Sequence, residues 1–385
     1  MPSPLASLAR ASISSSIDYR PSLDEQATFT KITLTPDSGV LHPDGRRVFY
    51  PGSTINGTVT FYVASAIRAQ HLKIILRSSE RLEYGATGWG SNPPPTHVFA
   101  VKTHLWGLKH KEPNPNKWPR LEAGTYTYPF AIELPMVNYN MTYQNQSYQS
   151  FFSLQTAVVR ATDSLPEYTD VYPIEFMPFI ATSLHKEVHT EAKGVDHVMG
   201  EIIVPETGFL AGETASFQLR LTPNGPCTHN KIVSVQAKLK QIITIGYDGY
   251  YRMERNDIST TKATAPQSLP ETLSMELCIP KTSLPSISYS SHLKILYQLY
   301  VTVHLKSNTL FRHKIKFAVP ITVGTLGRGI SPPRELLSYT DREVLCESGM
   351  RFKPRFLLNE QLCDEDNLPA YDECSPPTYQ QALEA

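Results

Sequence analysis

The sequence has few cysteines and no excess of charge of either sign. Its five cysteines are scattered, and no two of them are separated by only two residues (Cys227, Cys278, Cys346, Cys363 and Cys374). This spacing argues against zinc and redox motifs and favours a reducing compartment. Lysine plus arginine and aspartate plus glutamate number 36 each, so the formal net charge is zero. A neutral chain has no bulk electrostatic attraction for nucleic acid or anionic lipid.

Long apolar segments are also missing. Residues 1–20 contain no apolar core of the length found in signal peptides. No apolar run in the sequence approaches the roughly 18 residues needed to span a bilayer. We therefore expect a cytosolic protein. Without secretion, the glycosylation sequons at Asn56, Asn140 and Asn145 are expected to be unused.

Motifs that carry catalysis are absent as well. The sequence has neither a Gly-x-Ser-x-Gly nucleophile elbow nor a glycine-rich phosphate-binding loop. His185 and His189 are four residues apart, but Glu187 lies in the wrong place for a zinc protease, which favours two solvent-facing histidines over a metal site. Cys227 and His229 precede an expected strand, where a turn explains them as well as a thiolate pair does. We expect no catalytic residue, no metal and no cofactor.

What the sequence does contain is strict alternation of apolar and polar residues. This period-two pattern runs through 55–63, 72–77, 217–221, 233–239 and 295–305. Strands of this kind bury one face, so the pattern predicts an all-β protein of antiparallel sheets stacked as sandwiches. Two other segments carry weaker expectations. Residues 85–119 are expected to form a long loop in which His104, Trp106 and His110 pack together, and residues 334–347 permit one short helix.

The chain repeats its landmarks in one order. Tyr50-Pro51-Gly52 and Ala211-Gly212 each open a strand, and the two glycines are 160 residues apart. Each half later contains a strand that ends in proline, at Pro135 and at Pro280. Such repetition predicts two copies of one sandwich, although all-β chains resemble one another. The predicted divisions are a disordered segment, an N-domain, a C-domain and a flexible tail (1–27, 28–180, 181–326 and 327–385).

The tail carries the most informative short motif. It reads Pro376-Pro377-Thr378-Tyr379, and a degenerate copy lies upstream at Leu368-Pro369-Ala370-Tyr371. Consecutive prolines hold an extended polyproline conformation that loses little entropy on entering the aromatic groove of a WW domain. The tyrosine two residues later occupies a neighbouring pocket and sets the register. The alternative is a proline-rich end that binds nothing.

These landmarks together resemble the arrestin family. The resemblance extends over residues 28–326 and the tail motifs, and is greatest to the α-arrestins, the arrestin-related trafficking adaptors of fungi. It rests on the aromatic-Pro-Gly turn before INGTVTF (55–61), on LEAGTYTYPFAIELP (121–135), and on FLAGETASF (209–217), ELCIP (276–280) and FAVPITVG (317–324). It implies two tandem immunoglobulin-like sandwiches that engage membrane cargo.

The resemblance also implies a partner and its binding residues. In α-arrestins the tail motifs recruit a HECT-type, Nedd4-type ubiquitin ligase through its WW domains. Pro376, Pro377 and Tyr379 match the recruitment motif fully, whereas Pro369 and Tyr371 match a weaker form in which Leu368 replaces the first proline. Lysines near a docked ligase become candidate acceptors of ubiquitin because of their high effective concentration; they are Lys231, Lys238, Lys240, Lys314, Lys316 and Lys353.

The function expected from the sequence is therefore that of an adaptor without catalytic activity. It would act in the cytoplasm and be recruited to the plasma membrane or endosomes, where its cargo is a transporter or receptor. Ser375 directly precedes the prolines, and its phosphorylation would add charge at the docking motif. Lys314 and Lys316, with Arg312, form a basic patch that could meet acidic cargo tails or anionic lipid. Two alternatives stay open: a structural subunit of a retromer-like sorting coat, and a carbohydrate-active β-sandwich enzyme, for which no paired carboxylate site is evident.

Overall fold

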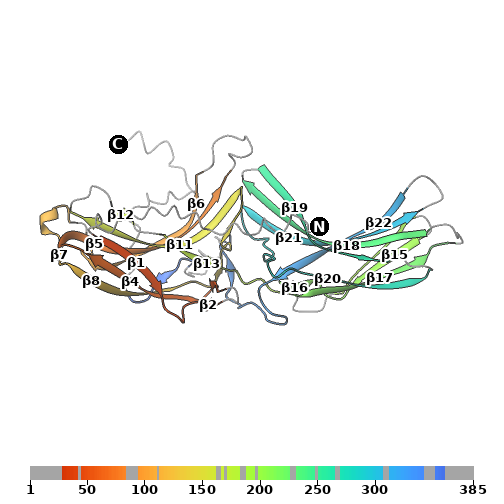
Figure 1. The fold of residues 1–385 in the computed structure, drawn as a ribbon, viewed down its shortest axis with the longest axis horizontal. Coiled ribbons are helices and arrows are strands. Elements are labelled where there is room, and N and C mark those ends of the chain that lie inside the picture. Colours follow the sequence, from red (N-terminus) through yellow and green to blue (C-terminus); the bar gives the residue numbers. More distant parts are fainter. Residues whose placement is uncertain are drawn as a thin grey trace, which may run out of the picture.

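The computed structural model shows an elongated protein built almost entirely of β-strands (Figure 1). It describes residues 28–41, 45–83, 94–110, 112–161, 166–168, 171–182, 188–195, 198–225, 231–247, 250–264, 269–306, 312–341 and 352–359. Two pairs of sheets lie end to end along the long axis (Figure 1). We call the pair containing β1 to β13 the N-half and the pair containing β14 to β22 the C-half.

The N-half consists of a small sheet and a large one. The small sheet has the strand order β1-β4-β8-β24, and the path of the large sheet is β2-β3-β13-β11-β5-β6. The elements of this half are β1 (Thr28–Leu34), β2 (Val40–Leu41), β3 (Arg47–Phe49), β4 (Thr54–Val63), β5 (Ile67–Leu82), β6 (Thr96–Gly107), the 3₁₀ turn η3 (Pro115–Lys117), β7 (Arg120–Leu121), β8 (Gly124–Glu133), β9 (Val137–Asn138), β10 (Tyr143–Gln144), β11 (Tyr148–Arg160), β12 (Glu167–Tyr168) and β13 (Tyr172–Phe176).

The C-half repeats this plan. Its sheets have the orders β14-β15-β17-β20 and β16-β22-β21-β18-β19. Its strands are β14 (His189–Val195), β15 (Val198–Val204), β16 (Gly208–Leu210), β17 (Thr214–Pro223), β18 (Lys231–Tyr247), β19 (Tyr250–Ala263), β20 (Glu271–Cys278), β21 (Leu293–Lys306) and β22 (Arg312–Gly324). Two further strands, β23 (Leu337–Ser338) and β24 (Arg355–Phe356), follow and pair with the N-half.

The predicted sandwiches are confirmed, because alternation along each strand becomes alternation of burial. In β4, Ile55, Val59 and Phe61 are fully buried, while the intervening threonines are only partly covered. In β21, every second residue from Leu293 to Leu305 is buried. Each such strand gives its apolar face to the space between two sheets and leaves the other face to solvent.

The two halves have the same topology. The order β3-β13-β11-β5-β6 in the N-half corresponds strand for strand to β16-β22-β21-β18-β19 in the C-half, and each path starts with a parallel pair. The turn before β4 contains Gly52 with φ +75°, and the turn before β17 contains Gly212 with φ +94°. Glycine adopts this backbone conformation without the steric cost that a Cβ brings, so both copies keep it in the same turn.

Strands β5 and β11 contribute side chains to both hydrophobic cores. Leu72, Leu76 and Phe152 belong to the N-half core, but Leu82 at the end of β5 and Tyr148 at the start of β11 pack in the C-half core. The side chain of Met141 joins them there. The halves are therefore connected by shared packing as well as by the chain itself.

Two sequence-based expectations need correction. The tail predicted from residue 327, for which the sequence allowed one short docked segment, is docked at two places: β23 pairs in parallel with β9, and β24 pairs antiparallel with β8. Residues 334–341 contain turns and β23 instead of the permitted short helix. Pairs of two residues are too short to produce a periodic pattern, and each is stabilised by an edge strand distant in the sequence.

The predicted loop over residues 85–119 is also wrong in its central part. Residues 96–107 form β6, which pairs along the length of β5. Phe99, Val101 and Thr103 are buried on one face of β6, so the alternation was present in the sequence. The neighbouring histidines and lysines on the opposite face obscured it. Among the described residues, no helix is long and apolar enough to cross a membrane.

Because the packing is shared, a substitution on an N-half strand should destabilise the C-half. Replacing Leu82, which is 4% exposed, by alanine removes a buried side chain from the C-half core. We expect Leu82→Ala to lower the free energy of unfolding in urea by about 2–5 kcal/mol. Hydrogen exchange should then show lost protection in C-half strands. The matched control is Leu357→Ala, at a leucine that is 47% exposed, which should change stability by less than about 0.5 kcal/mol. Equal effects of the two variants would contradict the shared core.

Candidate functional site

The chain leaves the C-half at Gly324 and returns to the N-half as a segment that we call the strap (residues 325–341 and 352–359). The strap begins against the linker between the halves (residues 177–182). Thr325 Oγ1 donates to the carbonyl of Pro178 at 2.7 Å and accepts from the Ile180 amide at 2.8 Å. The amides of Thr325 and Leu326 both donate to the carbonyl of Ile180, at 2.9 and 3.1 Å. The two connections between the halves are thus bonded to each other.

A glycine allows these two connections to approach. A Cβ built on Gly324 would lie 2.7 Å from Thr182 Cγ2 and 2.8 Å from the carbonyl oxygen of Ile180. Contacts this short require the backbone of the linker to move. The glycine at the end of β22 therefore fixes how closely the strap follows the linker.

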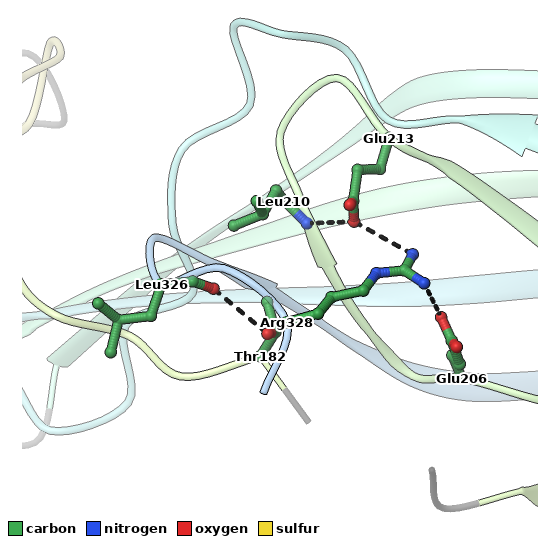
Figure 2. A network of polar contacts seen from close by, with 6 residues as sticks. All are labelled: Thr182, Glu206, Leu210, Glu213, Leu326 and Arg328. Carbon is green, nitrogen blue, oxygen red and sulfur yellow. Dashed lines mark hydrogen bonds and ion pairs between the residues drawn. The ribbon is translucent and has the colours of Figure 1, made fainter. Parts of the chain in front are cut away.

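Arg328 fastens the start of the strap to the C-half (Figure 2). Its guanidinium lies 2.6 Å from Glu206 Oε2 and 3.4 Å from Glu213 Oε2, and Glu213 also accepts from the Leu210 amide at 2.8 Å. The Arg328 side chain is 48% exposed. Solvent screening at such a site reduces an ion pair to about 0–1 kcal/mol. The charged contacts therefore orient the strap more than they stabilise it.

The rest of the strap lies on the N-half. The Leu337 amide donates to the carbonyl of Met136 at 3.2 Å, and the Tyr339 amide donates to that of Asn138 at 3.0 Å. Further along, the Leu357 amide donates to the carbonyl of Ala131 at 2.9 Å. Arg355 pairs with Glu133, and the Tyr139 hydroxyl donates to the carbonyl of Phe352. The chain beyond Asn359 thus starts from the edge of the N-half small sheet.

A buried polar cluster joins the N-half, the C-half and the strap. We call it the seam cluster, and its members are Glu80 on β5, Asn140, Tyr148 on β11, Ser290 from the C-half and Tyr339 from the strap. Asn140 Nδ2 lies 2.9 Å from Glu80 Oε1, 2.8 Å from the Tyr148 hydroxyl, 2.7 Å from Ser290 Oγ and 3.0 Å from the Tyr339 hydroxyl. An amide has only two hydrogens, so these oxygens share the donor.

Burial dominates the electrostatics of the seam cluster. Desolvation raises the pKa of Glu80 above its ordinary value. Hydrogen bonds with Tyr339, Asn140 and Tyr148 and the electrostatic effect of His292 lower this pKa, but the effect of burial is larger. Desolvation likewise raises the pKa of the Tyr148 hydroxyl well above its usual range. The tyrosines are therefore neutral hydroxyl groups, and Glu80 is the member of the cluster whose charge is opposed by burial.

The predicted ligase-binding residues lie outside the described residues. They are Leu368, Pro369, Tyr371, Pro376, Pro377 and Tyr379, and the candidate phosphorylation site Ser375 lies with them. Their roles stay predictions.

The candidate acceptor lysines are not brought together at one point. Lys238 and Lys240 on β18 lie 2.6 and 3.5 Å from the carboxylate of Asp257. Lys314 and Lys316 are exposed on β22, and Lys353 in the strap lies over the ring of Phe352 at 5.6 Å. Lys231 begins β18, and its side chain is outside the described part of the structure.

Sequence reasoning did not find that several lysines share one face. The inward side chains of β18, β21 and β22 fill the C-half core, so the alternate residues of these strands point to the outer face of the large sheet. We call this surface the basic face. It contains Lys238, Lys240, Lys262, Lys294, Lys314 and Lys316. The period-two pattern combined with strand register is the signal that could have located it.

Two histidines lie on adjacent strands of the N-half. The rings of His71 on β5 and His104 on β6 are 5.0 Å apart between centroids. Burial, with lysine charges nearby, lowers the pKa of His71 to about 3 and that of His104 to about 4. Both are therefore neutral at pH 7 and act as packed rings. No group of three histidine, cysteine or acidic side chains among the described residues is arranged to hold a metal ion.

One comparison with known families identifies part of the chain. Residues 196–327 match the family model of the arrestin (or S-antigen) C-terminal domain. The match covers about a third of the sequence and falls on the C-half, from just before β15 to the start of the strap. No curated protein sequence matches the chain. The match and the paired sandwiches support an arrestin-family protein, while the predicted domain boundaries stay predictions.

The contacts of the strap predict which of its residues matters more for stability. Thr325→Val keeps the shape of the side chain but leaves the Ile180 amide and the Pro178 carbonyl without their partner. We expect this change to lower the free energy of unfolding in urea by about 1–2 kcal/mol. Arg328→Gln, at a solvent-exposed ion pair, should cost less than about 1 kcal/mol. A larger loss from Arg328→Gln would show that the charges, not the linker hydrogen bonds, hold the strap.

Proposed function

We propose that this protein is an adaptor without catalytic activity that recruits a WW-domain HECT-type ubiquitin ligase to a membrane transporter or receptor. The ligase would ubiquitinate the cargo and promote its endocytosis and its sorting to endosomes or the vacuole. The adaptor would act in the cytoplasm and join the plasma membrane or endosomes with its cargo. Transfer of ubiquitin is accelerated because the tether converts a bimolecular encounter into a local one.

The observation that carries this proposal is the Pro376-Pro377-Thr378-Tyr379 element. The arrestin match supports a scaffold role for the sandwiches. The strap supports the geometry of the tether, because its last described stretch bonds to the N-half at Leu357, and Pro376 follows 19 residues later (376 − 357). The basic face offers a broad surface for acidic segments of a cargo protein.

Removing the motif tyrosine tests recruitment directly. Tyr379→Ala removes the ring that is expected to fill a pocket of the WW domain. We therefore expect the affinity of the full chain for the WW domains to fall at least about tenfold, or 1.4 kcal/mol. The double variant Tyr371→Ala/Tyr379→Ala should lose more. Fluorescence anisotropy with isolated WW domains measures both. The matched control is Tyr251→Ala, at a tyrosine on β19 that is 74% exposed.

Two outcomes would point elsewhere. Undiminished binding by the double variant would refute ligase recruitment through the tail. Stable stoichiometric assembly with other coat proteins, seen by native mass measurement and unchanged in the double variant, would favour a retromer-like coat subunit instead.

The lysine environments predict an order of modification. Asp257 restrains the amines of Lys238 and Lys240, whereas Lys314 and Lys316 extend from β22 into solvent. In a reconstituted reaction with the ligase, we expect Lys314→Arg/Lys316→Arg to reduce ubiquitination of the adaptor more than Lys238→Arg/Lys240→Arg. Mass spectrometry of the modified lysines measures this. The reverse order would mean that ligase geometry, not amine mobility, selects the acceptor.

A further inference from the structure

A carboxylate group is buried where the two halves and the strap meet. Glu80 is 2% exposed and lies on the same face of β5 as Leu82, which packs in the C-half core. Its Oε1 accepts from Asn140 Nδ2, but its Oε2 has no hydrogen-bond partner in the described part of the structure. The Oδ1 atom of Asn140 is also buried without one. An ionised carboxylate in this position is costly, because half of it has lost water and gained nothing.

The surroundings of Glu80 come from several elements. The Tyr148 hydroxyl approaches from β11 and the Tyr339 hydroxyl from the strap, and both donate toward the carboxyl group. From the C-half, Tyr289 adds a neutral hydroxyl, and the ring of His292 lies close enough to act on Glu80 electrostatically.

The neighbours of Glu80 within its sheet add no compensating charge. Its register partners are Ser150 on β11 and Thr96 on β6. The next residue on β5, Arg81, faces the other side and pairs with Glu83 at 3.6 Å. The groups that make the site dry are thus those that would move if the halves or the strap separated.

We propose that Glu80 is a proton-dependent latch: the closed seam, with Tyr339 of the strap and residues 289–292 of the C-half in place, holds a proton on Glu80, and opening of the seam releases it. The released proton leaves a hydrated carboxylate. Acidification then favours the closed arrangement, and alkalinisation favours separation of the strap from the seam.

The sign follows from linkage. Burial raises the pKa of Glu80 in the closed seam, whereas in the open seam the carboxyl group is hydrated and its pKa returns to the ordinary value. Below that ordinary value both states are protonated and pH has no effect. Between the two pKa values the closed state binds one more proton than the open state. The equilibrium constant for opening of the seam therefore increases by up to about tenfold for each unit that the pH rises. Above the raised pKa the effect levels off.

Hydrogen exchange of the strap tests the latch. Peptides covering residues 336–341 are followed in the full chain from about pH 5 to about pH 8, in the wild type and in Glu80→Gln. Glutamine keeps the size and the acceptor oxygen but cannot ionise. Comparing the two proteins at each pH cancels the intrinsic pH dependence of exchange. We expect the ratio of wild-type to variant exchange to rise with pH, by up to about tenfold per unit. A ratio that is constant across the range would overturn the proposal and leave Glu80 a structural residue.

Two further variants keep the test decisive. Glu133→Gln removes an exposed carboxylate that also contacts the strap, through Arg355. The ratio of wild-type exchange to exchange in this variant should stay constant with pH. Tyr339→Phe removes a hydroxyl that lowers the pKa of Glu80, so it should shift the pH midpoint of strap opening upward. A midpoint that stays unchanged or moves downward contradicts the latch, even if Glu80→Gln fails to fold. None of these variants alters the tail motif, so the outcome does not depend on ligase recruitment.

Discussion

The structure depends on two strands that are long enough to belong to two hydrophobic cores. β5 and β11 lie mostly in the N-half sandwich, and the end of β5 and the start of β11 reach the C-half core through Leu82 and Tyr148. Separating the halves would expose these side chains, at roughly 25 cal/mol per Å² of apolar surface. A linker of a few residues could not impose that cost. Burial of these side chains therefore holds the two halves together, and the other contacts between the halves add smaller stabilising contributions.

The strap makes the main additional contacts between the halves. It adds hydrogen bonds to the linker through Thr325, and then an edge pairing with β8 through β24. These contacts are mostly backbone bonds at partly exposed sites, each worth about 0.5–1.5 kcal/mol net. Such a segment can open locally, although Phe356 at its far end belongs to the N-half core and would be exposed if that part detached. The polar seam cluster lies between these two kinds of contact, and this is why a charge on Glu80 can act on the strap without unfolding the sandwiches.

Sequence patterns predicted the parts of the fold that repeat and missed those that do not. Alternation over ten or more residues identified β4 and β21, and the two glycine turns revealed the duplication because both require positive φ. β23 and β24 contain two residues each, and the backbone of another strand determines them. Glu80 gave no signal either. In the sequence it is one charged residue in a polar run, and the seam cluster that buries it includes Ser290 and Tyr339, which are more than 200 residues away.

The neutral net charge conceals a local imbalance that bears on how such a scaffold binds. Six lysines share the basic face, and Asp257 offsets only part of their charge. Screening at physiological salt limits each charge to about 8 Å, so a partner meets the local face and not the neutral average. A charged sheet face of this kind makes contacts that weaken as salt rises, because each lysine acts mainly on groups within that distance.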